Sequence, residues 1–150
     1  MKIAASVAAV MLAVAISAPA FAQQPAPPVP SLYKRLGGYD AMAAVTDDFL
    51  RRLTSDPNFA RFFSGHSTDS LKKIRQLVVD QLCAATGGTC VYIGRDMKTA
   101  HAGLGISEKD WDTSVKYLTA TLDELNVPAK EKSEVLTAIS GLKKDIVEKP

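Results

Sequence analysis

The sequence predicts an all-α protein, and three observations support this fold class. Apolar residues recur three and four positions apart in four stretches, as they do on one face of an amphipathic helix. No stretch alternates between apolar and polar residues as a half-buried strand does. Glycine pairs separate the periodic stretches and allow sharp reversals of the chain after a helix. We therefore expect one helical domain without internal repeats.

The first thirty residues lie outside this expected domain. Residues 1–22, MKIAASVAAVMLAVAISAPAFA, combine a basic start, a short apolar stretch and an A-x-A ending, which is typical of a cleaved signal peptide. A retained N-terminal anchor is the alternative interpretation. Residues 23–30, QQPAPPVP, predict an extended proline-rich tether. We expect an exported, periplasmic domain over residues 31–150, with no stable membrane insertion once the signal is removed.

The composition indicates a single domain with no affinity for nucleic acid. About 120 residues follow the tether, enough for one hydrophobic core. The chain has 18 Lys and Arg against 16 Asp and Glu. Acidic and basic residues are interspersed, as in DDFLRR and AKEKSE, which is the pattern of a solvated helix face and not of a phosphate-binding stripe.

The first two periodic stretches predict two long helices. The first helix begins at Tyr39, and its apolar face consists of Met42, Val45, Phe49, Leu50 and Leu53. The second stops before Gly87-Gly88, and its apolar face consists of Leu71, Ile74, Leu77, Val78 and Leu82.

The last two stretches predict two further helices. Ser107 opens the third, with Asp110 placed to reach back in a capping box. Its apolar face consists of Trp111, Val115, Leu118, Leu122 and Leu125. The fourth begins near Pro128, a residue that suits a first helical turn. Its apolar face consists of Val135, Leu136, Ile139, Leu142 and Ile146.

The two cysteines, Cys83 and Cys90, leave two interpretations open. In an exported chain they can form a disulfide across the short loop between them, or they can remain partly buried thiols. Geometry decides between these, and the sequence does not show it. No C-x-x-C pattern is present, which excludes thioredoxin-like redox chemistry.

His101 lies on a short helix that we expect from about Asp96 to Ala102. Met97 precedes it by four positions and Leu104 follows it by three, so the imidazole shares its face with apolar side chains. Such a histidine can be a core residue bonded to a backbone carbonyl, or a metal ligand. Zinc would need three or four clustered donors, whereas the other histidine, His66, lies far off in a polar loop. A single axial bond to haem iron needs only one neutral imidazole.

Six segments in order resemble the group I truncated haemoglobins: SLYKRLGG, DDFLRRL, FFSG, ATGG, YIGRDMKTAHAGLGIS and ELNVP. The resemblance covers roughly residues 31–147. It implies a truncated globin fold, a two-over-two helical sandwich around non-covalent haem b. It also implies reversible binding of the diatomic gases oxygen, NO and CO at the iron. The chain lacks the C-x-x-C-H motif that attaches c-type haem covalently.

The resemblance implies roles for residues on the proximal side of the haem. His101 matches the histidine that binds the iron. Met97 and Leu104 match positions that line the proximal wall. Lys98, or Arg95 near it, matches a partner for the haem propionates.

On the distal side this chain departs from the family pattern. Phe63 matches the aromatic residue that packs on the haem face, with Phe62 as the alternative if the register shifts by one. Many members carry a distal tyrosine that, with a glutamine, donates hydrogen bonds to the gas ligand, but Leu50 occupies the tyrosine position. The distal positions of the next helix match Ile74, Leu77 and Val78, while Gln76 and Gln81 lie on neighbouring faces. We therefore expect an apolar distal pocket.

Three functions remain open from the sequence. The first is reversible gas binding, with a preference shifted toward CO and NO because these gases depend less on a distal hydrogen bond than oxygen does. The second is a haem redox enzyme, either a nitric oxide dioxygenase or peroxidase-like, which needs an unknown electron donor and gains little from an apolar pocket. The third is a haem-free helical adaptor.

Overall fold

The structure, a computed structural model, describes residues 28–150. The expected signal peptide and most of the expected tether lie outside the described residues. Eight helices follow one another in the described part, where the only β contact is an isolated bridge between Ser107 and Lys149. The predicted all-α class is confirmed. None of these helices is long and apolar enough to span a membrane.

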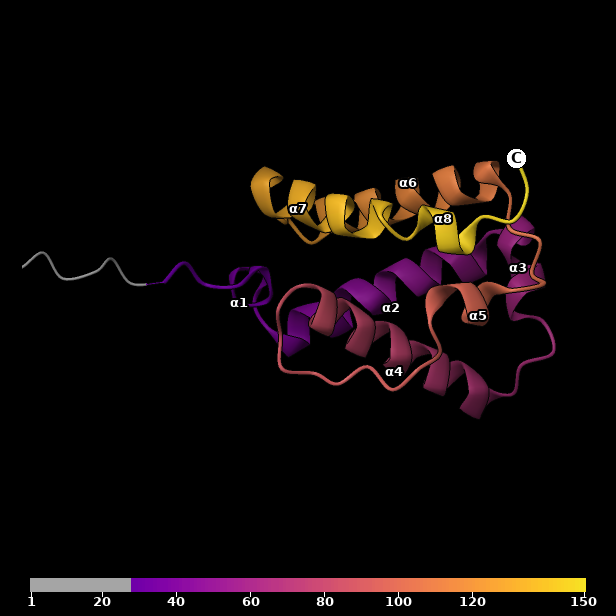
Figure 1. Ribbon diagram of the computed structural model, residues 1–150, viewed down its shortest axis with the longest axis horizontal. Helices are drawn as coiled ribbons and strands as arrows, with labels where there is room; N and C mark the ends of the chain where they lie inside the picture. Colours follow the sequence, from indigo (N-terminus) through magenta and orange to yellow (C-terminus); the bar gives the residue numbers. More distant parts are fainter. Residues whose placement is uncertain (1–27) are drawn as a thin grey trace, which may run out of the picture.

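The long helices form two layers, as Figure 1 shows. One layer contains α2 (Tyr39–Ser55) and α4 (Thr68–Ala85), and the other contains α6 (Glu108–Glu124) and α7 (Ala129–Ser140). Helix α2 packs against both α4 and α6 and so joins the layers. The two-over-two sandwich implied by the family resemblance is therefore the observed arrangement.

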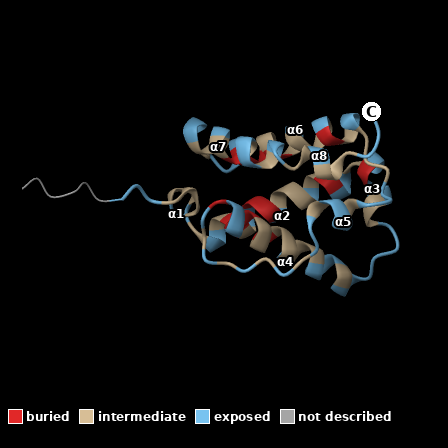
Figure 2. Cartoon of the chain, in the orientation of Figure 1, coloured by how far each residue is buried: buried red, intermediate tan, exposed pale blue. Residues whose placement is uncertain are grey.

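The hydrophobic core lies between these four helices, and Figure 2 shows buried residues on their facing sides. Its members are Met42, Val45, Val79, Leu82, Cys83, Leu118, Leu122 and Val135. Burying one such side chain stabilises a fold by about 1.5 to 3 kcal/mol. Most of these residues belong to the predicted apolar faces, whereas Leu71, Leu125 and Leu104 remain exposed.

Two short helices were not predicted because the apolar spacing of a five- or seven-residue segment is too short to recognise, and a third lies within a stretch predicted as one longer helix. Helix α1 (Leu32–Leu36) begins after Ser31, whose side chain accepts from the Lys34 N–H. Helix α3 (Pro57–Phe63) begins with a proline and is capped by Asp56. The third, α8 (Lys143–Ile146), belongs to a stretch that we expected to be one helix with α7.

The expectation of a continuous fourth helix was wrong. Helix α7 ends at Ser140, and the chain makes a tighter turn in which the Leu142 N–H donates to the Ile139 carbonyl at 2.9 Å. Gly141 lies at this turn, and glycine inside a helix costs about 1 kcal/mol relative to alanine. The apolar period continues through the break, so periodicity alone does not reveal it.

Candidate functional site

The candidate site is centred on α5 (Met97–His101), which carries the histidine singled out in the sequence. Asp96 caps its first turn by accepting from the Thr99 N–H at 2.9 Å and from the Thr99 hydroxyl at 2.7 Å. No residue of this helix is buried. Because burial does not anchor it, α5 depends on contacts at its two ends for its position.

The His101 ring has a defined protonation pattern. It is half-buried, and its Nδ1 lies 2.8 Å from the carbonyl oxygen of Met97. A carbonyl oxygen only accepts hydrogen bonds, so Nδ1 carries the proton and donates it. In the neutral ring Nε2 then has a free lone pair, which is the arrangement of a histidine that binds a metal.

Tyr92 contacts the backbone of the segment that precedes α5. Its hydroxyl donates to the Arg95 carbonyl oxygen at 2.6 Å, and its ring lies directly over Gly94. A Cβ at Gly94 would lie 2.3 Å from ring atoms, so only glycine fits there. Burial, together with the negative charge of Asp96, raises the pKa of the Tyr92 phenol.

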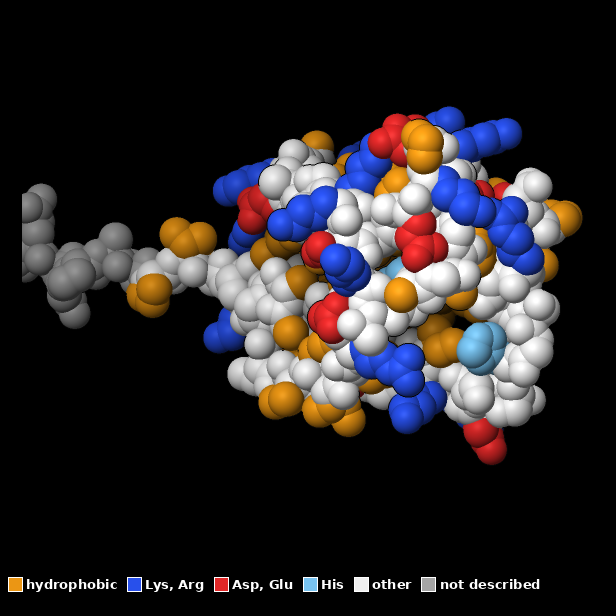
Figure 3. All heavy atoms as spheres, turned by 45° about the vertical axis from the view of Figure 1, so that its right-hand side comes forward, with side chains coloured by type: hydrophobic (Ala, Val, Ile, Leu, Met, Phe, Trp, Pro, Cys, Tyr) orange, Lys and Arg blue, Asp and Glu red, His pale blue; other side chains and the backbone are white. Residues whose placement is uncertain are grey.

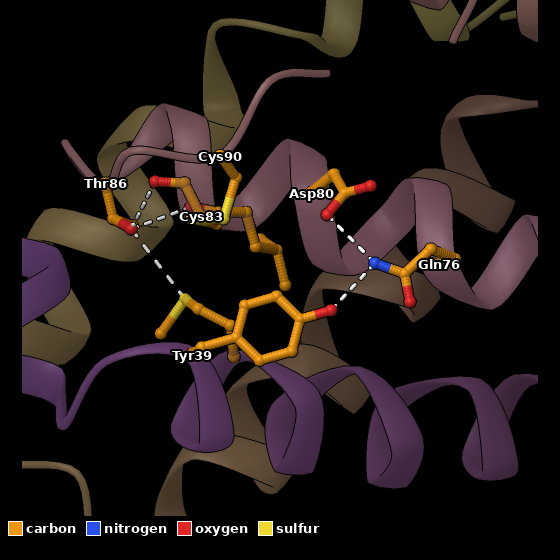
Figure 4. Close-up of a disulfide and its surroundings, with 8 residues drawn as sticks. Tyr39, Gln76, Asp80, Cys83, Thr86 and Cys90 are labelled. Carbon is orange, nitrogen blue, oxygen red and sulfur yellow. Dashed lines mark hydrogen bonds between the residues drawn. A yellow bond between two sulfur atoms is a disulfide. The ribbon is translucent and has the colours of Figure 1, made fainter. Parts of the chain in front are cut away.

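A disulfide between Cys83 and Cys90 ties the same segment to α4, which settles the question that the sequence left open. Figure 4 shows the bond at the C-terminal end of α4, beside Thr86. Cys83 is fully buried in the core, with its Cα 5.8 Å from that of Cys90. Gly88 permits this closure, because a Cβ there would lie 2.5 Å from the Cys83 sulfur.

At the C-terminal end of α5, a carboxylate holds the following loop. Glu148 accepts the Gly103 N–H at 2.7 Å through Oε1 and the Gly105 N–H at 2.5 Å through Oε2. These two hydrogen bonds lower the pKa of the Glu148 carboxyl. Glu148 was not predicted from the sequence. Its only sequence signal is the G-x-G spacing, and its partners lie 45 and 43 positions away along the chain.

On the distal side the structure brings three predicted residues together around one cavity of about 300 Å³. Leu50 from α2, Phe63 from α3 and Ile74 from α4 line it, together with Leu71. The polar lining residues are Asp47, Arg51 and Thr54. Figure 3 shows a face of the molecule on which hydrophobic side chains appear in hollows between Lys and Arg side chains.

The remaining predicted residues lie apart from this cavity. Val78 is half-buried against the core. Met97 is half-buried, Lys98 is exposed, and Leu104 is 41% exposed in the loop after α5. The lining of the cavity does not include His101.

Gln76 is held on the outer face of α4. Its amide nitrogen donates to the Tyr39 hydroxyl at 2.8 Å and to Asp80 at 2.9 Å. Figure 4 shows the amide between these two partners. Gln76 is therefore engaged away from the cavity, and Leu50 and Ile74 contribute only carbon atoms to its wall.

The donor set fits haem. A single histidine with its Nε2 lone pair free can form one axial bond, and carbon-only side chains can face a flat apolar ring. Within residues 28–150, no three His, Cys, Asp or Glu side chains cluster as the ligands of a zinc site do.

The sequence of this chain is similar to those of known globins. A model of the bacterial-like globin family matches residues 31–148. The chain is 34% identical over 116 residues to a group 1 truncated haemoglobin of Mycolicibacterium paratuberculosis, covering 77% of this chain and 83% of that protein. It is 35% identical over 115 residues to one of Synechocystis, covering 74% of this chain and 90% of that protein.

Solved structures give the same similarity in three dimensions. The truncated haemoglobin from Tetrahymena pyriformis aligns with a TM-score of 0.72 at 30% identity, covering 79% of this chain and 98% of that one. The 2/2 haemoglobin from Synechococcus, crystallised with covalently attached haem, aligns with a TM-score of 0.71 at 30% identity and the same coverage. Sequence and structure thus lead to one family.

Proposed function

Because the chain belongs to the bacterial-like globins, and among them to the group 1 truncated haemoglobins, we propose that it binds haem through His101 and binds diatomic gases reversibly. The observation that carries this proposal is the hydrogen bond from His101 Nδ1 to the Met97 carbonyl. In the neutral ring this bond selects the tautomer whose Nε2 lone pair is free to bind iron. Met97 thus acts through its backbone, while its side chain and that of Leu104 face the proximal side of the ring.

Haem would supply an iron atom that His101 could bind and that could hold a gas ligand. The residues proposed for the distal side are Leu50, Phe63, Ile74 and Val78. None of these four side chains can donate a hydrogen bond to the ligand. Of the polar residues that line the same cavity, Thr54 donates its hydroxyl to the Leu50 carbonyl at 2.8 Å, and Arg51 pairs with Asp48. A hydrogen bond to the ligand contributes roughly 1 to 2 kcal/mol, or about tenfold in affinity. We therefore propose oxygen, NO and CO as ligands, with CO and NO favoured over oxygen relative to members that carry a distal tyrosine.

We propose that the haem is haem b, held without a covalent link. Both cysteines are joined in the disulfide, so neither thiol is free to attach a vinyl group. Lys98 on α5 and Arg95 just before it are exposed, and their charges can pair with the propionates.

We also propose that the domain works outside the cytoplasm, in the periplasm, after removal of residues 1–22. The Cys83–Cys90 disulfide supports this location, because disulfides persist in oxidising compartments. Residues 23–30 then remain as a tether ahead of the globin domain. Mass spectrometry of the periplasmic fraction tests this: the predicted N-terminus is Gln23, and a full-length cytoplasmic chain would contradict it.

A haem titration tests the proposed function. Apoprotein with its disulfide intact is mixed with increasing haem while the Soret absorbance is followed. We expect saturation at one haem per chain and a shift of the Soret band when the reduced form meets CO. Absorbance that rises without saturation would contradict haem binding and favour a helical adaptor.

A further inference from the structure

Residues 147–150, the C-terminal segment after α8, bond to the loop that follows His101. We call this segment the clamp. The main helical neighbour of α5 is α8. Directly after α8, the Glu148 N–H donates to the Ile106 carbonyl at 2.8 Å, and the Lys149 carbonyl accepts from the Glu108 N–H at 3.0 Å. The backbone of the clamp thus holds the far end of the loop, residues 106–108.

The Glu148 side chain holds the near end of the same loop. Each carboxylate oxygen accepts one backbone N–H, from Gly103 and from Gly105. The positive φ angles of these glycines, 81° and 64°, turn both N–H groups toward one acceptor. Gly103 is two residues after His101, and the Leu104 N–H donates to the His101 carbonyl at 3.2 Å. A displacement of this loop therefore displaces the end of α5.

The bond from Nδ1 to the Met97 carbonyl holds the imidazole on α5. Because α5 has only five residues and none of them is buried, packing alone does not fix the position of the helix itself. The N-terminal end is held by the Asp96 cap and by the hydrogen bond from Tyr92 to the Arg95 carbonyl. The C-terminal end, which carries His101, has the Glu148 carboxylate as its main side-chain anchor in the described structure.

We propose that Glu148 is a positioning residue for His101. By accepting hydrogen bonds from the Gly103 and Gly105 N–H groups, it sets the position and orientation of the imidazole that would bind the iron. This inference rests on the proposed function, since it concerns the histidine that would bind the iron. Glu148 does not touch the haem in this account and acts only through the loop.

The substitution Glu148→Gln tests the inference with almost no change of shape. A glutamine side chain can accept one of the two N–H groups with its oxygen, but its NH₂ group then faces the other N–H as a second donor. Glu108→Gln is the matched control, because it also neutralises a carboxylate, at the first residue of α6, beside the clamp. The Glu108 side chain pairs with Lys143 at 3.3 Å, and only the backbone N–H of Glu108 bonds to the clamp.

Three measurements on the full chain compare the wild type with both variants. Amide hydrogen exchange at Gly103 and Gly105 reports the two hydrogen bonds to Glu148 directly and needs no haem. The iron–histidine stretching band of the ferrous form, from resonance Raman spectra, reports the orientation of His101. The rate at which haem transfers to an excess of apomyoglobin reports how tightly the protein holds the haem.

For Glu148→Gln we expect faster amide exchange at both glycines, about tenfold at the one that loses its acceptor and less at the one that still bonds to the amide oxygen. We also expect a shifted or broadened iron–histidine band and haem loss several times faster, with Glu108→Gln equal to the wild type. An unchanged band and unchanged haem loss would overturn the inference even if the variant unfolds at a lower temperature. A wild type that takes up no haem would overturn the proposed function, and the inference with it.

Discussion

At the scale of single residues, the site depends on which atoms of each side chain are free. His101 could be selected from the sequence because its apolar neighbours lie at helical spacing. The bond to the Met97 carbonyl, which frees Nε2, appears only once α5 is folded. Glu148 could not be selected, because a carboxylate that binds backbone amides 45 residues away leaves no pattern in side-chain types.

Leu50 gives the residue-scale prediction for the distal side. Leu50→Tyr adds a hydroxyl to the wall of the cavity, at the position that the family resemblance matches to a distal tyrosine. We expect it to slow oxygen dissociation about tenfold by a hydrogen bond of roughly 1 to 2 kcal/mol, measured by stopped-flow displacement with CO. Leu50→Phe is the control of nearly the same size. If both variants release oxygen at one rate, the missing donor does not govern oxygen binding.

At the scale of elements, α2 and α6 are joined by a polar contact between Asp48 and Thr121. Asp48 on α2 accepts from the Thr121 hydroxyl at 2.6 Å and from Arg52 Nε at 2.6 Å, and it also pairs with Arg51. Burial acts to raise the pKa of the Asp48 carboxyl, but these hydrogen bonds outweigh it and lower the pKa well below its ordinary value of 3.8.

This shift predicts how the contribution of Asp48 to stability depends on pH. A carboxyl with a lowered pKa in the folded state stabilises the fold above the unfolded-state pKa, and the contribution is lost as the pH falls toward the folded-state pKa. We expect Asp48→Asn to lower the free energy of unfolding by about 1 to 3 kcal/mol at pH 7. In urea titrations the difference in the free energy of unfolding between the wild type and Asp48→Asn should become smaller below pH 4. The same difference at pH 7 and at pH 3 would contradict this prediction.

The disulfide joins two other elements, α4 and the segment that leads into α5. It closes a loop of eight residues, for which the chain-entropy estimate is about 2 to 3 kcal/mol. We expect reduction of the wild type, or Cys90→Ser, to lower the free energy of unfolding by this amount in urea titrations. The Cys90→Ser variant should not respond to reductant. A reduced wild type with the same urea midpoint as the oxidised form would show that the bond does not stabilise the fold.

Some helix boundaries could be predicted from the sequence, and others could not. The capping box of Ser107 and Asp110 and the short helix around His101 are present as predicted. The break between α7 and α8 was missed, because apolar residues continue at helical spacing on both sides of Gly141. Periodicity reports which face is buried, but it does not report a local change in backbone turn.

At the scale of the whole molecule, the two-layer arrangement follows from four amphipathic helices that need to bury one face each. The sequence predicted those faces, and the core confirms most of their residues. The layers leave α5 at their margin without buried residues, so the candidate site depends on tethers at both ends of that helix. The core thus supports the segment that carries His101, which is held by a few hydrogen bonds and one disulfide.

The most direct test of this account is the optical spectrum of His101→Ala beside the wild type and His66→Ala, in ferric, dithionite-reduced and CO-bound forms. We predict that the wild type and His66→Ala share a Soret band that shifts with CO. In His101→Ala the band should be lost or strongly altered, and added imidazole should restore it. A His101→Ala spectrum equal to that of the wild type in all three forms would show that His101 does not bind the iron.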